Sequence, residues 1–142
     1  MRVCVVDGRG GGVGRELIAR LHLSYPGVHD VIGFATNRWA AHTMRKAGAA
    51  QVVSSEWAMF RSLAEADVIL GPLSMVLAGA LEGEVTAELA CAILQSRARK
   101  ILIPLTEGQI DLVGIDSPTL KPLLDAAIRR LEVVASSVGS SD

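Results

Sequence analysis

Five glycines stand within seven residues, directly after the apolar run Val3-Cys4-Val5-Val6 and ahead of a helical pattern. Glycine tolerates positive φ and leaves no Cβ between the backbone and a bound anion. The N–H groups and the positive dipole end of the following helix would attract that anion. The pattern therefore predicts a phosphate-binding loop. Its cofactor-binding residues are expected to be Asp7, Gly8, Arg9, Gly10, Gly11, Gly12, Val13, Gly14 and Arg15.

The spacing of these glycines excludes two known loops. A G-x-G-x-x-G frame would need glycine where the chain has Val13 or Arg15. A Walker A loop ends in Gly-Lys-Ser/Thr, whereas this loop ends in Gly14-Arg15-Glu16. The lysine for the phosphates and the hydroxyl for magnesium are both missing, so we do not expect ATP hydrolysis.

A third frame, G-x-x-x-G-x-G, fits through Gly8, Gly12 and Gly14. It resembles the loop of the short-chain dehydrogenases/reductases, with Asp7 where those enzymes usually carry threonine. The resemblance covers only the loop. The catalytic tyrosine of that family is followed four residues later by lysine, and the single tyrosine here, Tyr25, has no lysine at that spacing. We therefore do not expect a complete enzyme of that kind.

Asp7 has two interpretations. A carboxylate at the tip of the first strand repels anions unless it accepts hydrogen bonds from loop N–H groups, which would make Asp7 a brace for the loop. A catalytic role would instead require a raised pKa. The bracing role is favoured.

Small and polar residues also follow other expected strands and are expected to bind the cofactor: Thr36, Asn37 and Arg38 after the second strand and Gly71-Pro72 after the fourth. Thr36 and Asn37 would offer uncharged donors. In a dinucleotide site, an acid about 20 residues beyond the glycine loop binds the ribose, while arginine suits a 2′-phosphate. The tip at Thr36-Asn37-Arg38 contains no carboxylate. We therefore expect NADP(H) to bind better than NAD(H), if a dinucleotide binds. The alternative is that Arg38 is a solvated residue in the first turn of a helix.

Strand and helix patterns alternate along the chain. Apolar strand patterns cover residues 2–6, 28–36, 51–53, 67–70 and 100–105, and residues 110–115 form a sixth strand or the second arm of a hairpin. Helical patterns cover residues 15–23 (ended by Tyr25-Pro26-Gly27), 38–47, 55–66, 74–81, 86–97 and a last helix opened by Ser117-Pro118. Ser55 and Thr86 are expected N-caps. Continuous apolar strands belong to a sheet covered on both faces. The class is α/β: a single Rossmann-like three-layer sandwich over residues 1–135, with a mostly parallel, doubly wound sheet of five or six strands and a disordered tail over 136–142.

Several motifs along the chain occur in the order found in one bacterial family. They are Asp7-Gly8, Gly10-Gly11-Gly12, Gly14, Thr36-Asn37 with Ala40, Ala47-Gly48-Ala49, Gly71-Pro72, Gly83-Glu84-Val85-Thr86 and Lys100 to Leu105. On these residues the chain resembles the family of domain of unknown function 3842. The resemblance implies a Rossmann-like fold and the location of the site, and it implies no activity.

Composition and charge exclude several classes of partner. The formal net charge is −1 over 142 residues, which gives no electrostatic footprint for a nucleic acid or an anionic membrane. No apolar stretch is long enough to cross a bilayer. Cys4 and Cys91 both lie in apolar patterns and are expected to be buried, reduced thiols, which suits the cytoplasm.

Other side chains receive structural interpretations. The histidines are scattered, without partners at ligand spacing, so no metal site is expected: His22, His29 and His42. Three acids suit the start of a helix, where the dipole favours them: Glu82, Glu84 and Glu88. Trp39 and Trp57 are expected in the core or at an interface. A helix over residues 74–81 without charge on any face is either deeply buried or used between subunits, and the seam of a homodimer is favoured.

Two functions fit these observations. The first is a non-enzymatic module, a sensor or partner subunit, that binds a nucleotide, a dinucleotide or a phosphorylated small molecule. The second is a small NADP(H)-dependent oxidoreductase, or another cofactor-dependent enzyme, whose site is completed across a dimer. A complete loop without a visible catalytic constellation favours the first.

Overall fold

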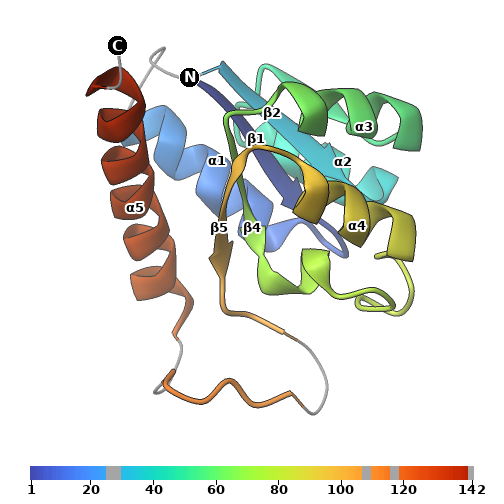
Figure 1. The fold of residues 1–142 in the computed structure, drawn as a ribbon. Coiled ribbons are helices and arrows are strands. Elements are labelled where there is room, and N and C mark those ends of the chain that lie inside the picture. The colour runs from blue at the N-terminus through green and yellow to red at the C-terminus, as the bar shows by residue number, and fades with distance from the viewer. Residues whose placement is uncertain (25–29, 107–109, 116–118, 141–142) are drawn as a thin grey trace.

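In the described part of the chain, five parallel strands form one sheet in the order β3-β2-β1-β4-β5 (Figure 1). The computed structural model describes residues 1–24, 30–106, 110–115 and 119–140. The strands are β1 (Arg2–Asp7), β2 (Asp30–Ala35), β3 (Gln51–Val53), β4 (Val68–Pro72) and β5 (Arg99–Ile103). The helices are α1 (Gly12–Ser24), α2 (Arg38–Lys46), α3 (Glu56–Glu65), the short 3-10 helix η1 (Leu73–Val76), α4 (Ala87–Gln95) and α5 (Leu120–Ser140). The predicted α/β fold is confirmed.

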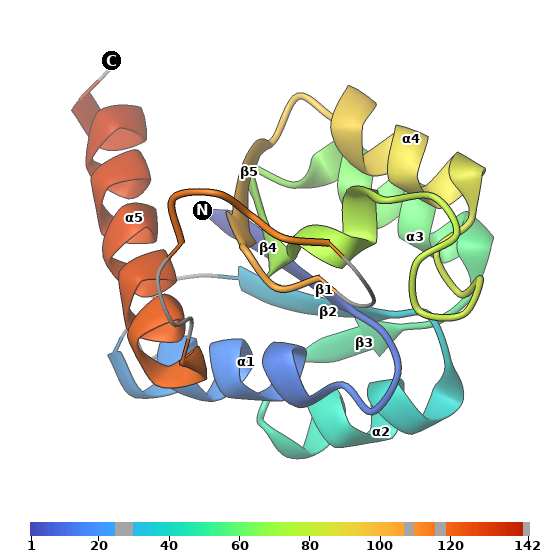
Figure 2. The same cartoon turned by 90° about the horizontal axis from the view of Figure 1, so that it is seen from below.

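The helices form two layers, one on each face of the sheet (Figure 2). Successive side chains of a strand point to opposite faces. Val3 and Val5 of β1 therefore pack with α1, α2 and α5, whereas Cys4 and Val6 pack with α3 and α4. An apolar residue at nearly every position of β1 follows from this double burial.

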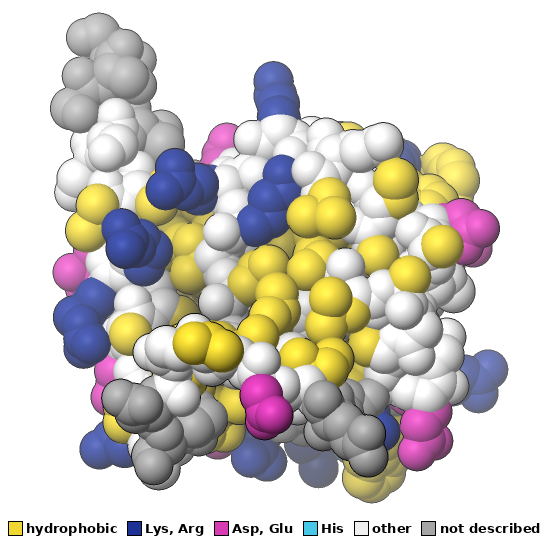
Figure 3. All heavy atoms as spheres, turned by 60° about the horizontal axis from the view of Figure 1, so that its bottom comes forward, with side chains coloured by type: hydrophobic (Ala, Val, Ile, Leu, Met, Phe, Trp, Pro, Cys, Tyr) yellow, Lys and Arg dark blue, Asp and Glu magenta, His cyan; other side chains and the backbone are white. Residues whose placement is uncertain are grey.

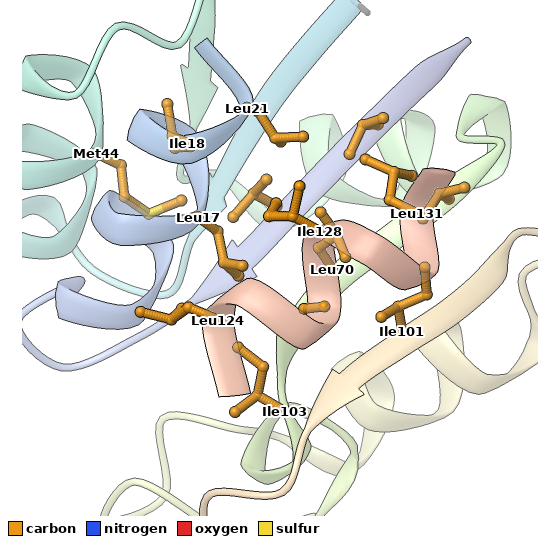
Figure 4. Packing of buried hydrophobic residues seen from close by; sticks show 14 of the residues in the cluster. Leu17, Ile18, Leu21, Met44, Leu70, Ile101, Ile103, Leu124, Ile128 and Leu131 are labelled. Carbon is orange, nitrogen blue, oxygen red and sulfur yellow. The ribbon is translucent and has the colours of Figure 1, made fainter. Parts of the chain in front are cut away.

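The larger of the two cores lies beneath α1 and α5 (Figure 4). Leu17 of α1, Leu70 of β4 and Ile128 of α5 meet there, and the side chains of Leu17 and Leu70 are fully buried. This core fixes the amino end of α1 against the carboxyl end of β1, and the glycine-rich segment connects these two ends. The position of the loop therefore depends on the sheet and α1 together.

Three helix starts carry side-chain caps, of which Ser55 and Thr86 were expected and Asn37 was not. Asn37 accepts a hydrogen bond from the N–H of Ala40, Ser55 from that of Ala58, and Thr86 from that of Leu89. Short polar side chains at these positions satisfy N–H groups that have no partner within the helix. The expected cap Ser117-Pro118 and the helix stop at Tyr25-Pro26-Gly27 lie outside the described residues, as does His29.

Two expected elements differ in the structure. Residues 110–115 are not a strand: they form an irregular segment with a turn, and Gly114 has a φ of +96° that a strand does not accommodate. Residues 74–81 are not a helix, because η1 ends at Val76 and tight turns follow, with Gly79 at a φ of +90°. Met75 and Leu81 are buried within this chain, whereas Ala78 and Gly79 are exposed. A homodimer through this segment stays a prediction.

Three side chains are more exposed than expected. Cys4 is buried as predicted, and burial raises the pKa of its thiol to about 12, but Cys91 lies on the outer side of α4. Trp39 and Trp57 are each 69% exposed and do not belong to the core of this chain, because each stands in the first turn of a helix on its outer side. At the other end of the chain, α5 continues to Ser140, into the segment expected to be a tail.

Replacement of Leu70 by alanine tests the packing of the sheet against α1 and α5. Leu70 is fully buried, so Leu70→Ala removes contacts and leaves a cavity, and the free energy of unfolding should fall by about 2–5 kcal/mol. The matched control is Leu94→Ala in α4, where the side chain is 58% exposed, and the change should be within about 0.5 kcal/mol. Urea denaturation measures both, and equal effects would contradict the assigned core.

Candidate functional site

A cavity of about 280 Å³ opens at the carboxyl end of the sheet, between the ends of β1, β4 and β5. Residues 7–13 of the glycine loop form one wall. The other lining residues come from the end of β4 and from the segments that follow β4 and β5 in the sequence: Pro72, Ser74, Leu81, Leu105 and Thr106. The chain order reverses between β1 and β4, where β1 has β2 on one side and β4 on the other. Open α/β sheets bind their ligands outside the strand ends at such a reversal. The cavity therefore has the expected position for a ligand site.

Three of the five loop glycines are required by the fold itself. A Cβ on Gly8 would lie 2.5 Å from Thr36 Oγ1, and one on Gly14 would lie 3.0 Å from Asp7 Cβ. Gly11 has a φ of +74° and a backbone that approaches α2, where a Cβ would lie 2.8 Å from the carbonyl oxygen of Ala40. The Gly11 N–H also donates to the Gly8 carbonyl at 2.9 Å, which closes the turn.

The other two glycines face open space. A Cβ on Gly12 would meet no atom within 4 Å, and one on Gly10 would meet only Trp39 Nε1, at 3.9 Å. Both residues line the cavity. Within the described residues, the N–H groups of Gly10 and Gly12 have no hydrogen-bond acceptor. Neither residue has the positive φ that would by itself favour glycine. The fold itself thus does not require glycine at positions 10 and 12. A ligand that approaches the backbone would require it, because a side chain there would block the approach.

Asp7 is the brace of the loop. Its side chain is buried, and one carboxylate oxygen accepts the N–H of Gly8 at 2.8 Å while the other accepts the N–H of Gly14 at 2.7 Å. Burial raises the pKa of this carboxyl; hydrogen bonds from Gly14, Gly8 and Val13 act in the opposite direction, and the charge of Glu84 adds to the rise. The two hydrogen bonds are those that the bracing interpretation predicts, and the raised pKa is the condition for a catalytic role, so each interpretation has one supporting observation.

Glu84 contacts the glycine loop and the tip of β2, which the sequence did not reveal. It stands three residues before Ala87, the first residue of α4. Its Oε1 accepts hydrogen bonds from Thr36 Oγ1 at 2.6 Å, Asn37 Nδ2 at 2.8 Å and the Arg9 N–H at 3.1 Å. Partial burial alone would raise the pKa of Glu84, but these three hydrogen bonds and the charge of Arg9 hold it below its ordinary value. The interpretation of Glu84 as a helix-start acid is therefore wrong, and among the three acids Glu88 alone lies in the first turn of α4.

A carboxylate, that of Glu84, therefore lies against the tip of β2. Thr36 and Asn37 were expected to offer uncharged donors to a ligand, but both donate to Glu84. Arg38 is the exposed first residue of α2. The expected preference for NADP(H) assumed a tip without a carboxylate, and the structure places the carboxylate of Glu84 there, from a segment nearly 50 residues further along the chain.

The remaining predicted site residues divide between the cavity and the fold. Arg9 lines the cavity, and its guanidinium pairs with Glu82 at 3.6 Å. Arg15 points to Glu16, at 3.3 Å, and is not part of the lining. Pro72 lines the cavity, but Gly71 does not: a Cβ there would lie 2.5 Å from the Val6 carbonyl oxygen, so this glycine serves the contact between β1 and β4.

Two further hollows lie beside the glycine-loop cavity. A groove of about 380 Å³ runs between β5 and α5, with Arg99 and Arg130 among its lining residues, and a hollow of about 370 Å³ is formed by residues 104–106 and 110–115. Figure 3 brings the carboxyl end of the sheet forward and shows hydrophobic side chains across the middle of this face, with basic side chains toward α5. Both hollows lie away from the amino end of α1 and its N–H groups, so the glycine-loop cavity is the better candidate for an anion.

No helix among the described residues is long and apolar enough to cross a bilayer. The same residues contain no group of three or more histidine, cysteine or acidic side chains arranged to hold a metal ion.

The sheet order, the two covered faces and the glycine-rich β1–α1 turn define a Rossmann-like α/β domain. Residues 2–136 match the model of a family described as a domain of unknown function (DUF3842), and the chain belongs to that family. The resemblance drawn from the sequence motifs is thereby confirmed.

Among solved structures, the chain is similar to a dodecameric FMN-dependent UbiX-like decarboxylase from Escherichia coli O157:H7. The match covers 95% of this chain and 76% of the decarboxylase chain, with 18% sequence identity and a TM-score of 0.48. A search of curated proteins gave no match.

The pKa values of the two carboxyls at the loop should be shifted in opposite directions from their ordinary values. The pKa of Glu84 lies below its ordinary value, so its stabilising contribution is present at neutral pH and is lost as the pH falls through its folded-state pKa. The pKa of Asp7 is raised, so its contribution is present below its unfolded-state pKa and is lost as the pH rises through its folded-state pKa. A carbon-detected NMR titration of the side-chain carboxyls measures both, and an Asp7 midpoint below the ordinary value for aspartate, or a Glu84 midpoint above the ordinary value for glutamate, would contradict the assignment.

Proposed function

We propose that this protein binds a nucleotide, or another phosphorylated small molecule, in the glycine-loop cavity, with a phosphate against the backbone of Gly10 and Gly12. The observation that carries the proposal is the open space at these two glycines. Their hydrogen atoms face the cavity, and in the described chain no acceptor engages their N–H groups. A phosphate oxygen can approach such a backbone closely, and the amino end of α1 adds the attraction of its dipole.

The carboxylate of Asp7 is compatible with an anion nearby because its charge is already met by N–H groups. Its two oxygens accept the N–H groups of Gly8 and Gly14, whereas no acceptor in the described chain engages the N–H groups of Gly10 and Gly12, which line the same cavity. Arg9, a further lining residue, supplies a positive charge. At Gly10 and Gly12 a phosphate would therefore meet N–H donors that no acceptor of the described chain engages.

The opposite wall suits the less polar part of a ligand. Pro72, Leu81 and Leu105 present apolar surface across the cavity from the loop. Its volume of about 280 Å³ lies at the low end for small-molecule sites, which span roughly 300–1,000 Å³. The cavity would enclose a phosphate and the group next to it, while the rest of the ligand extends along the carboxyl edge of the sheet.

The lining residues favour binding over catalysis. Each oxygen of Asp7 is held by a backbone N–H, and the Ser74 hydroxyl donates to the Leu105 carbonyl at 3.0 Å. A group that transfers protons must lie within hydrogen-bond reach of the substrate, and both of these polar side chains are instead engaged with the protein backbone. A sensor or partner subunit that retains its ligand therefore fits these contacts better than a hydrolase or transferase does.

Gly12→Val tests the proposal, because it places branched carbons in the open space where the phosphate would lie. A thermal-shift panel of NAD⁺, NADP⁺, FAD, ATP and ADP identifies the ligand, and calorimetry then measures its affinity. Gly12→Val should weaken binding at least about tenfold, or roughly 1.4 kcal/mol. The fold should be retained, since no protein atom lies within 4 Å of the new Cβ.

Ala87→Val is the matched control, because Ala87 is the exposed first residue of α4 as Gly12 is the exposed first residue of α1. It should leave affinity unchanged. If Gly12→Val folds and binds with the affinity of the wild type, the loop is a structural turn and the proposal is wrong.

A further inference from the structure

Building on the proposed nucleotide site, we propose that Glu84 accepts a hydrogen bond from the ribose of the ligand. It would thereby select nucleotides whose 2′-hydroxyl is free over those that are 2′-phosphorylated. NAD(H) would then be preferred to NADP(H), the reverse of the expectation drawn from Arg38. Glu84 is the residue that determines this specificity.

The placement of Glu84 carries the inference. Its Oε1 is bound to both side chains at the tip of β2, Thr36 and Asn37, and to the backbone of the glycine loop at Arg9. In Rossmann-type dinucleotide sites an acid that follows the glycine loop in sequence accepts hydrogen bonds from the ribose. Here the acid comes from the turn before α4 and reaches the same corner, between the glycine loop and the β2 tip.

The carboxylate has room for one more donor. Oε1 already accepts three hydrogen bonds, whereas Oε2 accepts none from any residue that the structure describes. Its side chain is partly exposed, so a ligand can reach it. A ribose hydroxyl can donate to Oε2, because a hydroxyl carries a proton to give.

A 2′-phosphate offers no such proton and brings negative charge to a carboxylate that its neighbours keep ionised. Like charges in a partly buried site repel each other. Arg38 stands next to this corner at the exposed start of α2, so it is the competing candidate, and it would favour the phosphate. The two residues therefore predict opposite preferences.

The test compares NAD⁺ and NADP⁺, which differ only in the 2′-phosphate, on the full chain by calorimetry. The wild type should bind NAD⁺ at least about tenfold more tightly. Glu84→Gln keeps an oxygen that can accept from Thr36 and Asn37 but removes the charge, so the preference should fall to within about threefold, mainly through tighter binding of NADP⁺. Glu88→Gln is the matched control in the first turn of α4, and it should retain the preference of the wild type.

The outcomes separate the two proposals. A wild-type preference for NADP⁺ that Arg38→Ala abolishes, or a ratio that Glu84→Gln leaves unchanged, would overturn the role of Glu84 and leave the nucleotide site intact. Binding of another member of the panel, with neither dinucleotide bound, would overturn the predicted preference for NAD(H) and leave the nucleotide site intact. If no nucleotide of the panel binds the wild type, the proposed function fails and this inference fails with it.

Discussion

The carboxylate of Asp7 holds the glycine loop in its shape. One oxygen binds the N–H at the start of the turn, Gly8, and the other binds the N–H of Gly14 in the first turn of α1. A buried carboxylate is costly unless it is hydrogen-bonded, and the N–H groups of a helix start are costly unless they find acceptors. The Asp7 carboxylate and these N–H groups satisfy each other, and their hydrogen bonds join the end of β1 to the start of α1. The glycines between them line the cavity.

Glu84 ties this loop to the rest of the carboxyl edge. It connects the loop backbone at Arg9 with the β2 tip at Thr36 and Asn37, while itself belonging to the turns between η1 and α4. Those turns contain two residues with positive φ outside glycine, Leu81 and Glu82, directly before the segment that presents Glu84. Backbone strain of this kind persists where the surrounding contacts determine the conformation. The strained turn, the loop and the β2 tip thus form one connected polar edge around the cavity.

The sequence was sufficient for the parts of the molecule that depend on local patterns. Continuous apolar strands predicted a sheet covered on both faces, capping residues such as Thr86 marked the helix starts, and the position of Asp7 between a strand and glycines indicated a brace. Each of these depends on neighbours within a few residues, so spacing alone contains the information.

The sequence was insufficient where distant segments meet. Glu84 lies 47 residues from Asn37, and its contact depends on a turn that resembles an uncharged helix in sequence. The apolar residues 110–115 also read as a strand, but no partner strand pairs with them within the described chain, and Gly114 turns the backbone. Distinguishing the glycines likewise required coordinates, because only the surroundings show that Gly8, Gly11 and Gly14 serve the fold whereas Gly10 and Gly12 face open space.

Amide hydrogen exchange at single residues tests the central claim most directly. The N–H groups of Gly8 and Gly14 are held by Asp7, so they should exchange slowly with or without ligand. Those of Gly10 and Gly12 should exchange rapidly in the free protein and become protected when the nucleotide identified by the panel is bound. Protection that is unchanged at Gly10 and Gly12, or that appears instead along the groove between β5 and α5, would contradict the account.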